Sequence, residues 1–415
     1  MKKFFVVLCV AGLIAACGSP LFAGGIENKT NWSAEWVRTL NRNAATDSAD
    51  AVAYNPAGVM KMDNGLYLNA SGQYAFKDYK STYLGTQYET DEPDFVPSFF
   101  TLYKHDKWAA FGAVTIVVAG GKVDYEHGDY TTLRLASGII AQYNASLPGA
   151  FASILDQRLE GKSYFVGYTL GGAYKINDML SVSLAARYVD ASRDFKGYAT
   201  LGGGLLPTQT FGVDYEETGN GWGGIFGINI TPIEKLNIGL RYETKTSIDL
   251  STHVTTDDIG IVTEGFQRSR DLPAVLGVGV SYKFTPKIRV EADLTYYFND
   301  DASWEDNPIT SGNETVKDDG YDVGIACEYT FNPKWKASVG YMYTWVGINP
   351  DNMSIETPEL DASTIAGGVA YKPAPNWDLN LGVLKTFYDD ATTSYGLHFE
   401  KDVVIVGLGI QYKFF

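Results

Sequence analysis

The stretch that decides the fold is residues 288–298, IRVEADLTYYF, because apolar and polar side chains alternate along it. The even positions from Ile288 to Phe298 are apolar or aromatic, whereas Arg289, Glu291 and Asp293 are charged. Successive side chains of a β-strand point to opposite faces, so this segment has one hydrophobic face and one charged face. Strands with a hydrophobic face toward lipid and a polar face toward a lumen are typical of membrane β-barrels.

The same alternation recurs along the chain and predicts fourteen strands. A tilted strand needs about 9–11 residues to cross a bilayer. The predicted strands begin near Leu66, Asp94, Lys107, Ser163, Leu180, Gly221, Lys235, Pro273, Lys287, Gly320, Trp335, Ser363, Asn376 and Asp402. Short turns with Asn and Pro alternate with long polar loops, as they do at the periplasmic and outer ends of such barrels. We therefore predict an all-β fold, a 14-stranded antiparallel transmembrane β-barrel in an outer membrane.

The composition agrees with a membrane barrel and excludes one class of partner. The chain contains 28 Tyr, 21 Phe and 44 Gly, and its formal net charge is −16. Nucleic-acid binding needs a basic surface, so no nucleic-acid partner is expected. Aromatic residues at both ends of the predicted strands, such as Tyr371 and Trp345, predict a girdle at each membrane interface.

Residues 1–23 are interpreted as a signal peptide. Lys2 and Lys3 precede an apolar stretch too short to span a bilayer, and Ala23 ends a small-residue cleavage site. Cys17, which follows two alanines, offers lipidation as an alternative. After cleavage at Ala23, Cys327 stands alone, so neither a disulfide nor a Cys-based metal site is expected.

Residues 24–64 lack the two-residue alternation, whereas residues 65–415 form the predicted barrel. Trp32, Trp36 and Leu40 are spaced by four and predict the apolar face of a short helix. A fourteen-stranded barrel is wider than its own inward side chains can fill. We therefore predict that residues 24–64 form a hatch, or plug, inside the lumen.

The chain resembles the FadL/TodX family of outer-membrane channels for hydrophobic compounds. The residues that carry the resemblance are Asn55, Pro56 and Ala57, a hatch motif placed directly before the first strand. Leu272-Pro273-Ala274, at the start of the eighth strand, is a second local match.

The resemblance implies transport of long-chain fatty acids or aromatic hydrocarbons. A hydrophobic ligand is caught outside, passes to a lumenal pocket and leaves sideways through a kinked third strand, against which the hatch motif lies. Such a route keeps apolar cargo out of water. Outer-membrane lipids and lipopolysaccharide are the expected surroundings. The C-terminal strand ends at Phe414 and Phe415 and resembles the signal that barrel-assembly machinery reads.

The candidate for the kink is the segment where alternation fails in the third strand: Val117, Val118, Ala119, Gly120 and Gly121. Glycine inside a strand marks a bulge or a close backbone approach. A plain strand end that enters a loop is the alternative interpretation.

The longest loop carries apolar residues at spacing four on both sides of Pro148. These residues are Leu135, Ile139, Ile140, Tyr143, Leu147, Phe151, Ile154, Leu155 and Leu159. The spacing predicts two short amphipathic helices. They are either the walls of an extracellular capture groove or loop elements that pack on neighbouring loops.

Arg187, Arg241 and Arg289 are predicted to point into the lumen, where a cation would suit a carboxylate ligand. Acidic residues share their faces, as Glu243 does for Arg241, so ion-pair ladders are the competing use. The charges therefore do not identify the ligand.

Enzymatic and metal functions find no support in the sequence. Outer-membrane hydrolases need a His beside a nucleophile, but His105, His127, His253 and His398 all fall in predicted turns or loops. No cofactor and no metal site are expected. A general porin or a surface-attachment barrel remains the alternative function, although a porin would keep its lumen open.

Overall fold

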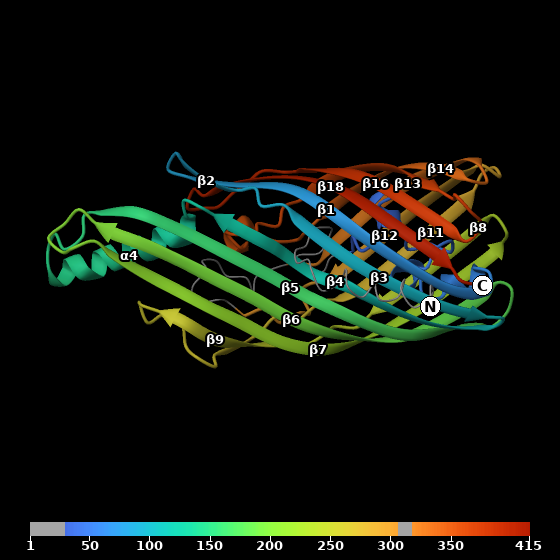
Figure 1. The fold of residues 1–415 in the computed structure, drawn as a ribbon, viewed down its shortest axis with the longest axis horizontal. Helices are drawn as coiled ribbons and strands as arrows, with labels where there is room; N and C mark the ends of the chain where they lie inside the picture. The colour runs from blue at the N-terminus through green and yellow to red at the C-terminus, as the bar shows by residue number, and fades with distance from the viewer. Residues whose placement is uncertain (1–29, 306–317) are drawn as a thin grey trace, which may run out of the picture.

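The computed structural model describes residues 30–305 and 318–415, and it contains one closed antiparallel sheet (Figure 1). The predicted signal peptide and the first residues of the predicted plug lie outside the described residues. The helical elements are α2 (Ala34–Val37), α3 (Ala51–Tyr54), η1 (Gly58–Lys61), α4 (Tyr130–Ser146) and η2 (Pro350–Asn352). The described helices include none that is both long and apolar enough to cross a membrane.

Fourteen strands form the wall of the barrel, as the sequence predicted. They are β1 (Gly65–Tyr83), β3 (Asp94–His105), β4 (Trp108–Tyr125), β5 (Ser153–Lys175), β6 (Leu180–Gly202), β7 (Gln209–Ile233), β8 (Leu236–Glu243), β11 (Ala274–Lys283), β12 (Ile288–Phe298), β13 (Gly320–Asn332), β14 (Trp335–Trp345), β15 (Ala362–Tyr371), β16 (Trp377–Tyr388) and β18 (His398–Lys413). Each pairs with the next, and β18 pairs with β1 to close the barrel. The short strands β2 (Thr86–Thr90), β9 (Asp249–Asp257), β10 (Gln267–Ser269) and β17 (Ala391–Thr392) extend this sheet in the outer loops.

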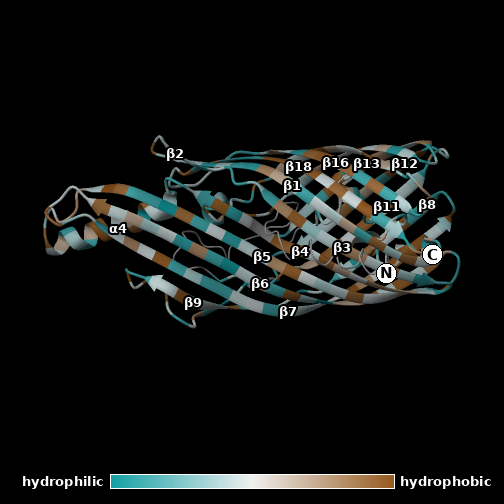
Figure 2. Cartoon of the chain, in the orientation of Figure 1, coloured by the Kyte–Doolittle hydropathy of each residue, from teal (hydrophilic) through white to brown (hydrophobic). Residues whose placement is uncertain are grey.

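The alternation predicted from residues 288–298 is present in β12. Ala292 and Leu294 are exposed on the outer face, whereas Glu291 and Thr295 are buried toward the lumen. Figure 2 shows hydrophobic and hydrophilic residues alternating along the strands. Two aromatic pairs at the short-turn end, the stacked Trp335–Tyr371 pair and the tilted Trp377–Tyr412 pair, lie where the periplasmic girdle was predicted.

Three predicted strand starts were wrong. β5 begins at Ser153, β7 at Gln209 and β18 at His398, each several residues before the predicted start. These extensions lead toward the loop end, where β5 to β7 project beyond the rest of the barrel (Figure 1). A strand outside the bilayer needs no apolar outer face, so the pattern used to detect spanning strands does not mark its beginning.

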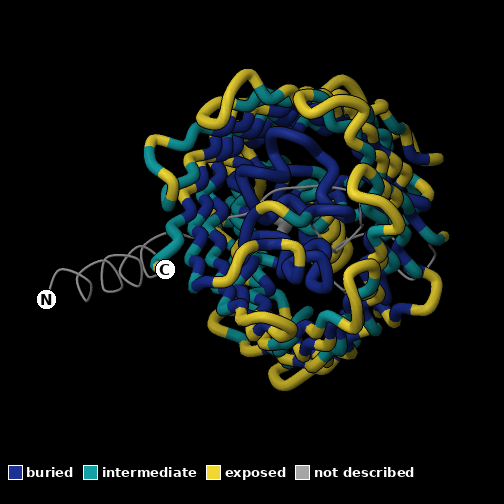
Figure 3. The backbone as a smooth tube through the Cα atoms, turned by 90° about the vertical axis from the view of Figure 1, so that its right-hand side faces the viewer, coloured by how far each residue is buried: buried dark blue, intermediate teal, exposed yellow. Residues whose placement is uncertain are grey.

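The segment from residue 30 to residue 64 lies within the barrel, where the end-on view shows buried chain surrounded by the wall (Figure 3). The single helix predicted through Trp32, Trp36 and Leu40 was wrong, because α2 covers only four residues. Ser33 caps it by accepting from the Trp36 amide at 3.0 Å, Arg38 is its C-terminal cap, and Leu40 follows with a left-handed φ of 60°. Trp32, Trp36 and Leu40 are nevertheless all buried.

Candidate functional site: a window between β3 and β4

The ladder between β3 and β4 is interrupted halfway along the strands. Pairing runs from His105 and Trp108 at the short turn to Phe99 and Val114 and ends there. Beyond this point, residues 94–98 of β3 pair with β1, and residues 115–125 of β4 pair with β5. The two strands therefore leave an unpaired stretch in the hydrogen-bonded wall, which we call the window.

β4 is irregular along the edge of the window. The β4–β5 register shifts between Ile116 and Val118 and again between Ala119 and Gly121, so Val117 and Gly120 are extra residues. Gly121 has a φ of 77°, a left-handed conformation that glycine adopts without steric penalty. β-Bulges bend the strand that carries them, and these two lie just beyond Val114, the last β4 residue that pairs with β3. Both irregularities fall within the five residues singled out in the sequence.

The loop-side end of the window is closed by polar contacts. The Lys77 ammonium contacts the Asp94 carboxylate and the Lys122 carbonyl, which joins β1, β3 and β4. The Asp124 amide of β4 donates to Thr90 Oγ1 of β2 at 2.9 Å. The window is therefore bounded at both ends.

Trp32 of the N-terminal segment covers the window from the lumen. Its indole Nε1–H donates to the Ile116 carbonyl at 3.0 Å, on the β4 edge. Its backbone carbonyl accepts from the Ser98 hydroxyl, on the β3 edge. Trp32 thus forms hydrogen bonds with both strands at the point where β3 and β4 are not hydrogen-bonded to each other.

The position of Trp32 is fixed from the lumenal side. Its amide donates to the Tyr54 hydroxyl at 2.8 Å, and that hydroxyl donates to the Thr30 carbonyl at 2.7 Å. The guanidinium carbon of Arg241 lies 5.7 Å from the centre of the Trp32 ring, within the range of a cation–π interaction.

The hydrogen bonds of the hatch motif are made with β6 and β7. Asn55 Nδ2 donates to Asn229 Oδ1 at 2.8 Å, and the Ala57 carbonyl accepts from Ser181 Oγ at 2.7 Å. The elements on either side of the motif, α3 and η1, both contact β4, while Trp32 makes the hydrogen bond to Ile116 beside the bulge. Asn55 also stabilises the turn in which it lies, because its side-chain amide donates a hydrogen bond to the Ala45 carbonyl and accepts one from the Gly58 amide.

The three predicted lumenal cations point inward and form ion pairs. Arg187 and Arg241 both contact Glu243, and Arg289 lies 2.7 Å from Glu291. Glu328 also receives Arg38 of the N-terminal segment at 2.7 Å. Arg187 and Arg241 therefore pair within the wall, whereas Arg289 shares Glu328 with Arg38 of the N-terminal segment.

The buried side chains of the lumen are both apolar and polar along its axis. Toward the loop ends of β1, β4 and β5 they include Tyr79, Tyr125 and Phe165 together with Lys77 and Asp124. Toward the short turns they include Asn69 and Gln411 together with Tyr67 and Leu102. The two cavities beside Trp36 have volumes of about 20 and 10 Å³, which suit at most a water molecule.

The outer loop contains one of the two predicted helices. Leu135, Ile139, Ile140 and Tyr143 lie on α4, which begins with a capping box between Asp129 and Thr132. The second helix was wrong: Ile154, Leu155 and Leu159 lie on β5, and Leu147 and Phe151 are outside both elements. A spacing of four is also two strand periods, so it does not distinguish a helix face from a strand face.

The apolar residues of this loop pack mainly on one another and on β6. Ile139, Phe151 and Leu201 are buried in one cluster, with Tyr143 and Phe211 against it. Leu147 and Leu155 remain exposed. This agrees with the alternative of packing on neighbouring loops, while the exposed leucines leave some apolar surface.

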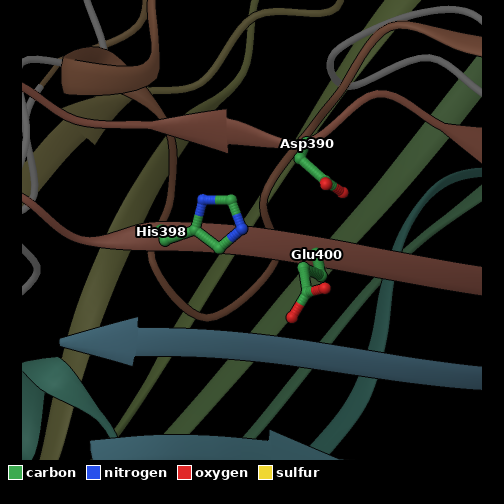
Figure 4. Close-up of side chains that lie close together, drawn as sticks. All are labelled: Asp390, His398 and Glu400. Atoms are coloured by element: carbon green, nitrogen blue, oxygen red, sulfur yellow. The ribbon is translucent and has the colours of Figure 1, made fainter. Parts of the chain in front are cut away.

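A small group of ligand-type side chains lies on the outer rim (Figure 4). Asp390, His398 and Glu400 offer ligand atoms within 4.8 Å of one another. His398 Nδ1 lies 2.9 Å from Thr392 Oγ1, which leaves Nε2 toward the carboxylates. The sequence did not suggest this group because its members approach only across a hairpin. We assign no metal to it.

A closed membrane barrel that holds part of its N-terminal segment inside and has one interrupted ladder in its wall is the class of protein that the fold and the site define. A family model described as outer membrane protein transport protein (OMPP1/FadL/TodX) matches residues 14–414. The chain belongs to this family of outer-membrane proteins.

Solved structures agree on the fold at low sequence identity. A FadL homologue from Pseudomonas aeruginosa is 13% identical, with a TM-score of 0.67, over 95% of this chain and 100% of that one. The toluene transporter TbuX of Ralstonia pickettii is 16% identical, with a TM-score of 0.63, over 91% and 99%. The toluene transporter TodX of P. putida is 12% identical, with a TM-score of 0.64, over 89% and 96%. No curated protein sequence matches the chain.

The sequence missed Ser98 and Ile116, which hold Trp32 at the window. One signal was present, because Pro97 lies within β3. Proline cannot donate to a ladder and is confined to strand edges and bulges. Pro97 therefore marked a strand with a free edge.

Proposed function

We propose that this barrel carries hydrophobic small molecules through the window between β3 and β4 into the bilayer. The observation that supports this proposal is the interrupted ladder covered by Trp32, because a wall with complete strand pairing has no lateral exit. Buried apolar side chains toward the loop ends of the lumen, such as Tyr79, Tyr125 and Phe165, would favour the passage of such a cargo. Removal of Trp32 from the window is the step that would open the route.

The cargo class that we propose is long-chain fatty acids or aromatic hydrocarbons. The exposed Leu147 and Leu155 beside α4 are where capture from outside would begin. The lumenal arginines are already paired with carboxylates, so they do not favour a fatty acid over a neutral hydrocarbon. This is a channel and not an enzyme in our proposal.

Deletion of Val117 and Gly120 tests the lateral route. Without the two extra residues β4 can continue its ladder with β3, so the window should close. Cells that carry wild type should take up radiolabelled oleate or toluene faster than empty-vector cells, and the deletion variant should fall to the empty-vector rate. Equal uptake in wild type and the deletion variant, at matched amounts of folded barrel, would exclude the window. Equal uptake in wild type and empty-vector cells would exclude hydrophobe transport.

The double variant Asn55→Ala/Pro56→Ala tests the hatch motif. Its contacts with Asn229 and Ala45 would be lost, so the plug should shift and uptake should change. Uptake equal to that of wild type would show that the motif is not needed.

A general porin is the alternative, and ion conductance separates the two functions. Deletion of residues 24–64 should turn a closed barrel into a leaky one. A porin would already conduct, and its conductance would barely change. The buried contacts between Arg38 and Glu328 and between Trp32 and the window support a closed lumen.

A further inference from the structure

The outer face of the barrel carries an apolar hollow of about 560 Å³. It runs across β3, β1, β18, β16, β15 and β14, and outward side chains line it, among them Phe95, Trp335, Tyr371, Leu408 and Ile410. Its volume is that of a pocket for a small molecule, about 300–1,000 Å³. In an outer-membrane barrel this face meets lipid, so the hollow is filled by hydrocarbon and not by water.

Glycines lie beside the hollow on both faces of the wall. On the inner face, a Cβ at Gly382 would lie 2.6 Å from the Arg38 amide nitrogen, and one at Gly368 would lie 2.5 Å from Arg38 Cβ. The wall can therefore approach the N-terminal segment closely here. On the outer face, Gly72 has no side chain, and a Cβ there would lie 2.7 Å from the Phe95 ring.

The hollow extends from the membrane interface into the hydrocarbon region. Trp335 and Tyr371 stack with ring centres 4.3 Å apart at the short-turn end, where aromatic girdles lie at headgroup level. Phe95 lies several residues further toward the loops, along the free segment of β3. A lipid with its headgroup at the periplasmic interface would place its chain along this line.

Two lysines lie at the interfacial end of the hollow. Lys334 directly precedes Trp335, and Lys372 directly follows Tyr371. The Lys372 amide donates to the Lys334 carbonyl at 2.9 Å, so the two residues are neighbours. Lys334 is exposed, and Lys372 is partly exposed beside Asp378 at 2.9 Å. Two ammonium groups in an acidic protein favour an anionic headgroup.

We propose that this hollow and these lysines form a binding site for one anionic glycerophospholipid of the periplasmic leaflet. One acyl chain occupies the hollow, and the phosphate faces Lys334 and Lys372. A neutral hydrophobic cargo gains nothing from the lysines, and free phosphate gains nothing from the hollow. Lipopolysaccharide belongs to the opposite interface, beyond the reach of these turns. The hollow borders the β3 edge of the window, because Phe95, Pro97 and Ser98 line it, but the lipid site does not rest on the transport route proposed above.

Native mass spectrometry with added phosphatidylglycerol tests the site in the detergent-purified barrel. Wild type should retain one more phosphatidylglycerol than Ala70→Phe, which fills the hollow from an outward position on β1. The matched control is Ala292→Phe, an exposed outward alanine on β12, a strand that does not line the hollow and is separated from β14 by β13. Equal lipid counts in Ala70→Phe and Ala292→Phe would overturn the proposal.

The headgroup is tested by Lys334→Gln/Lys372→Gln. A lysine near the membrane surface contributes about fivefold in affinity, so the double variant should bind phosphatidylglycerol about 25-fold more weakly. Lys287→Gln, in the similar Pro286-Lys287 turn between β11 and β12, should bind like wild type. Unchanged affinity in the double variant, or equal retention of oleyl alcohol and phosphatidylglycerol by wild type, would exclude an anionic-lipid site.

Discussion

Against β14 to β18 the N-terminal segment meets a continuous wall, whereas against β3 and β4 it meets a window. On the continuous side Arg38 donates to Asn380 and forms a buried ion pair with Glu328, and wall glycines allow backbone contact. On the window side one indole and one carbonyl of Trp32 contact the two strand edges. The difference teaches that the plug is anchored on one side and only covers the window on the other.

The anchored side should be the more sensitive to mutation. Arg38→Ala leaves Glu328 buried among fewer cations, and breaking one partner of a buried ion pair destabilises by about 3–5 kcal/mol. Urea unfolding in lipid vesicles measures this loss. Arg38→Met/Glu328→Gln removes both charges and should recover most of it. If the single variant is as stable as wild type, the anchoring role assigned to Arg38 is wrong.

Close contact with the wall predicts a second effect of intermediate size. A Cβ at Gly340 would lie 2.1 Å from the Thr39 carbonyl oxygen, so Gly340→Ala must push the plug off β14. Overpacking of this kind costs about 1–3 kcal/mol, and ion conductance in planar bilayers should rise. Gly367→Ala on β15 is the control, because its Cβ would have its nearest neighbour at an ordinary 3.4 Å. A silent Gly340→Ala variant would contradict backbone contact at this point.

The window side predicts a smaller change in stability together with a change in transport. Trp32→Phe keeps an aromatic ring but loses the donor to the Ile116 carbonyl, a loss of about 0.5–1.5 kcal/mol. With the cover loosened, uptake of radiolabelled toluene should be faster than in wild type. Trp36→Phe, at an equally buried tryptophan of α2, should leave uptake unchanged. Equal rates in the two variants would remove Trp32 from its proposed role as the cover.

The outer loop, far from both contacts, predicts the smallest effect. Burial and the neighbouring Glu356 carboxylate raise the pKa of Asp129 to about 7. Thr132 donates to Asp129 from its amide, and Thr131 donates to Glu356 at 2.6 Å, so both carboxyls face the start of α4.

Because the folded loop holds this proton more tightly than the unfolded chain, α4 docks best in acid. Docking should weaken as the pH rises through about 7. Amide exchange of residues 130–146, corrected for intrinsic rates, should be less protected at pH 8 than at pH 5.5. Asp129→Asn should lose most of this pH dependence. Equal protection of wild type at both pH values would show that the carboxyl does not titrate in this range.

How far the sequence predicted the site depends on the kind of contact. Val117 to Gly121 could be singled out because failed alternation and paired glycines are local signals. The contact of Trp32 with Ile116 joins residues 84 positions apart, and no local pattern encodes it. The second loop helix failed for the same reason, since spacing four suits either element and the pairing of β5 with β6 decided between them.

By itself the sequence determined that this chain is a fourteen-stranded membrane barrel with a non-strand segment before it. It could do so because alternating side chains must match lipid on one side and lumen on the other, which is a local requirement repeated in every strand. Only the tertiary structure decided where the wall is unpaired and which side chain covers the window. Closure of the barrel brings β3, β4 and the N-terminal segment together. Hydrogen bonds from Trp32 to Ile116 and from Ser98 to Trp32 then link the segment to the two strands where β3 and β4 do not pair.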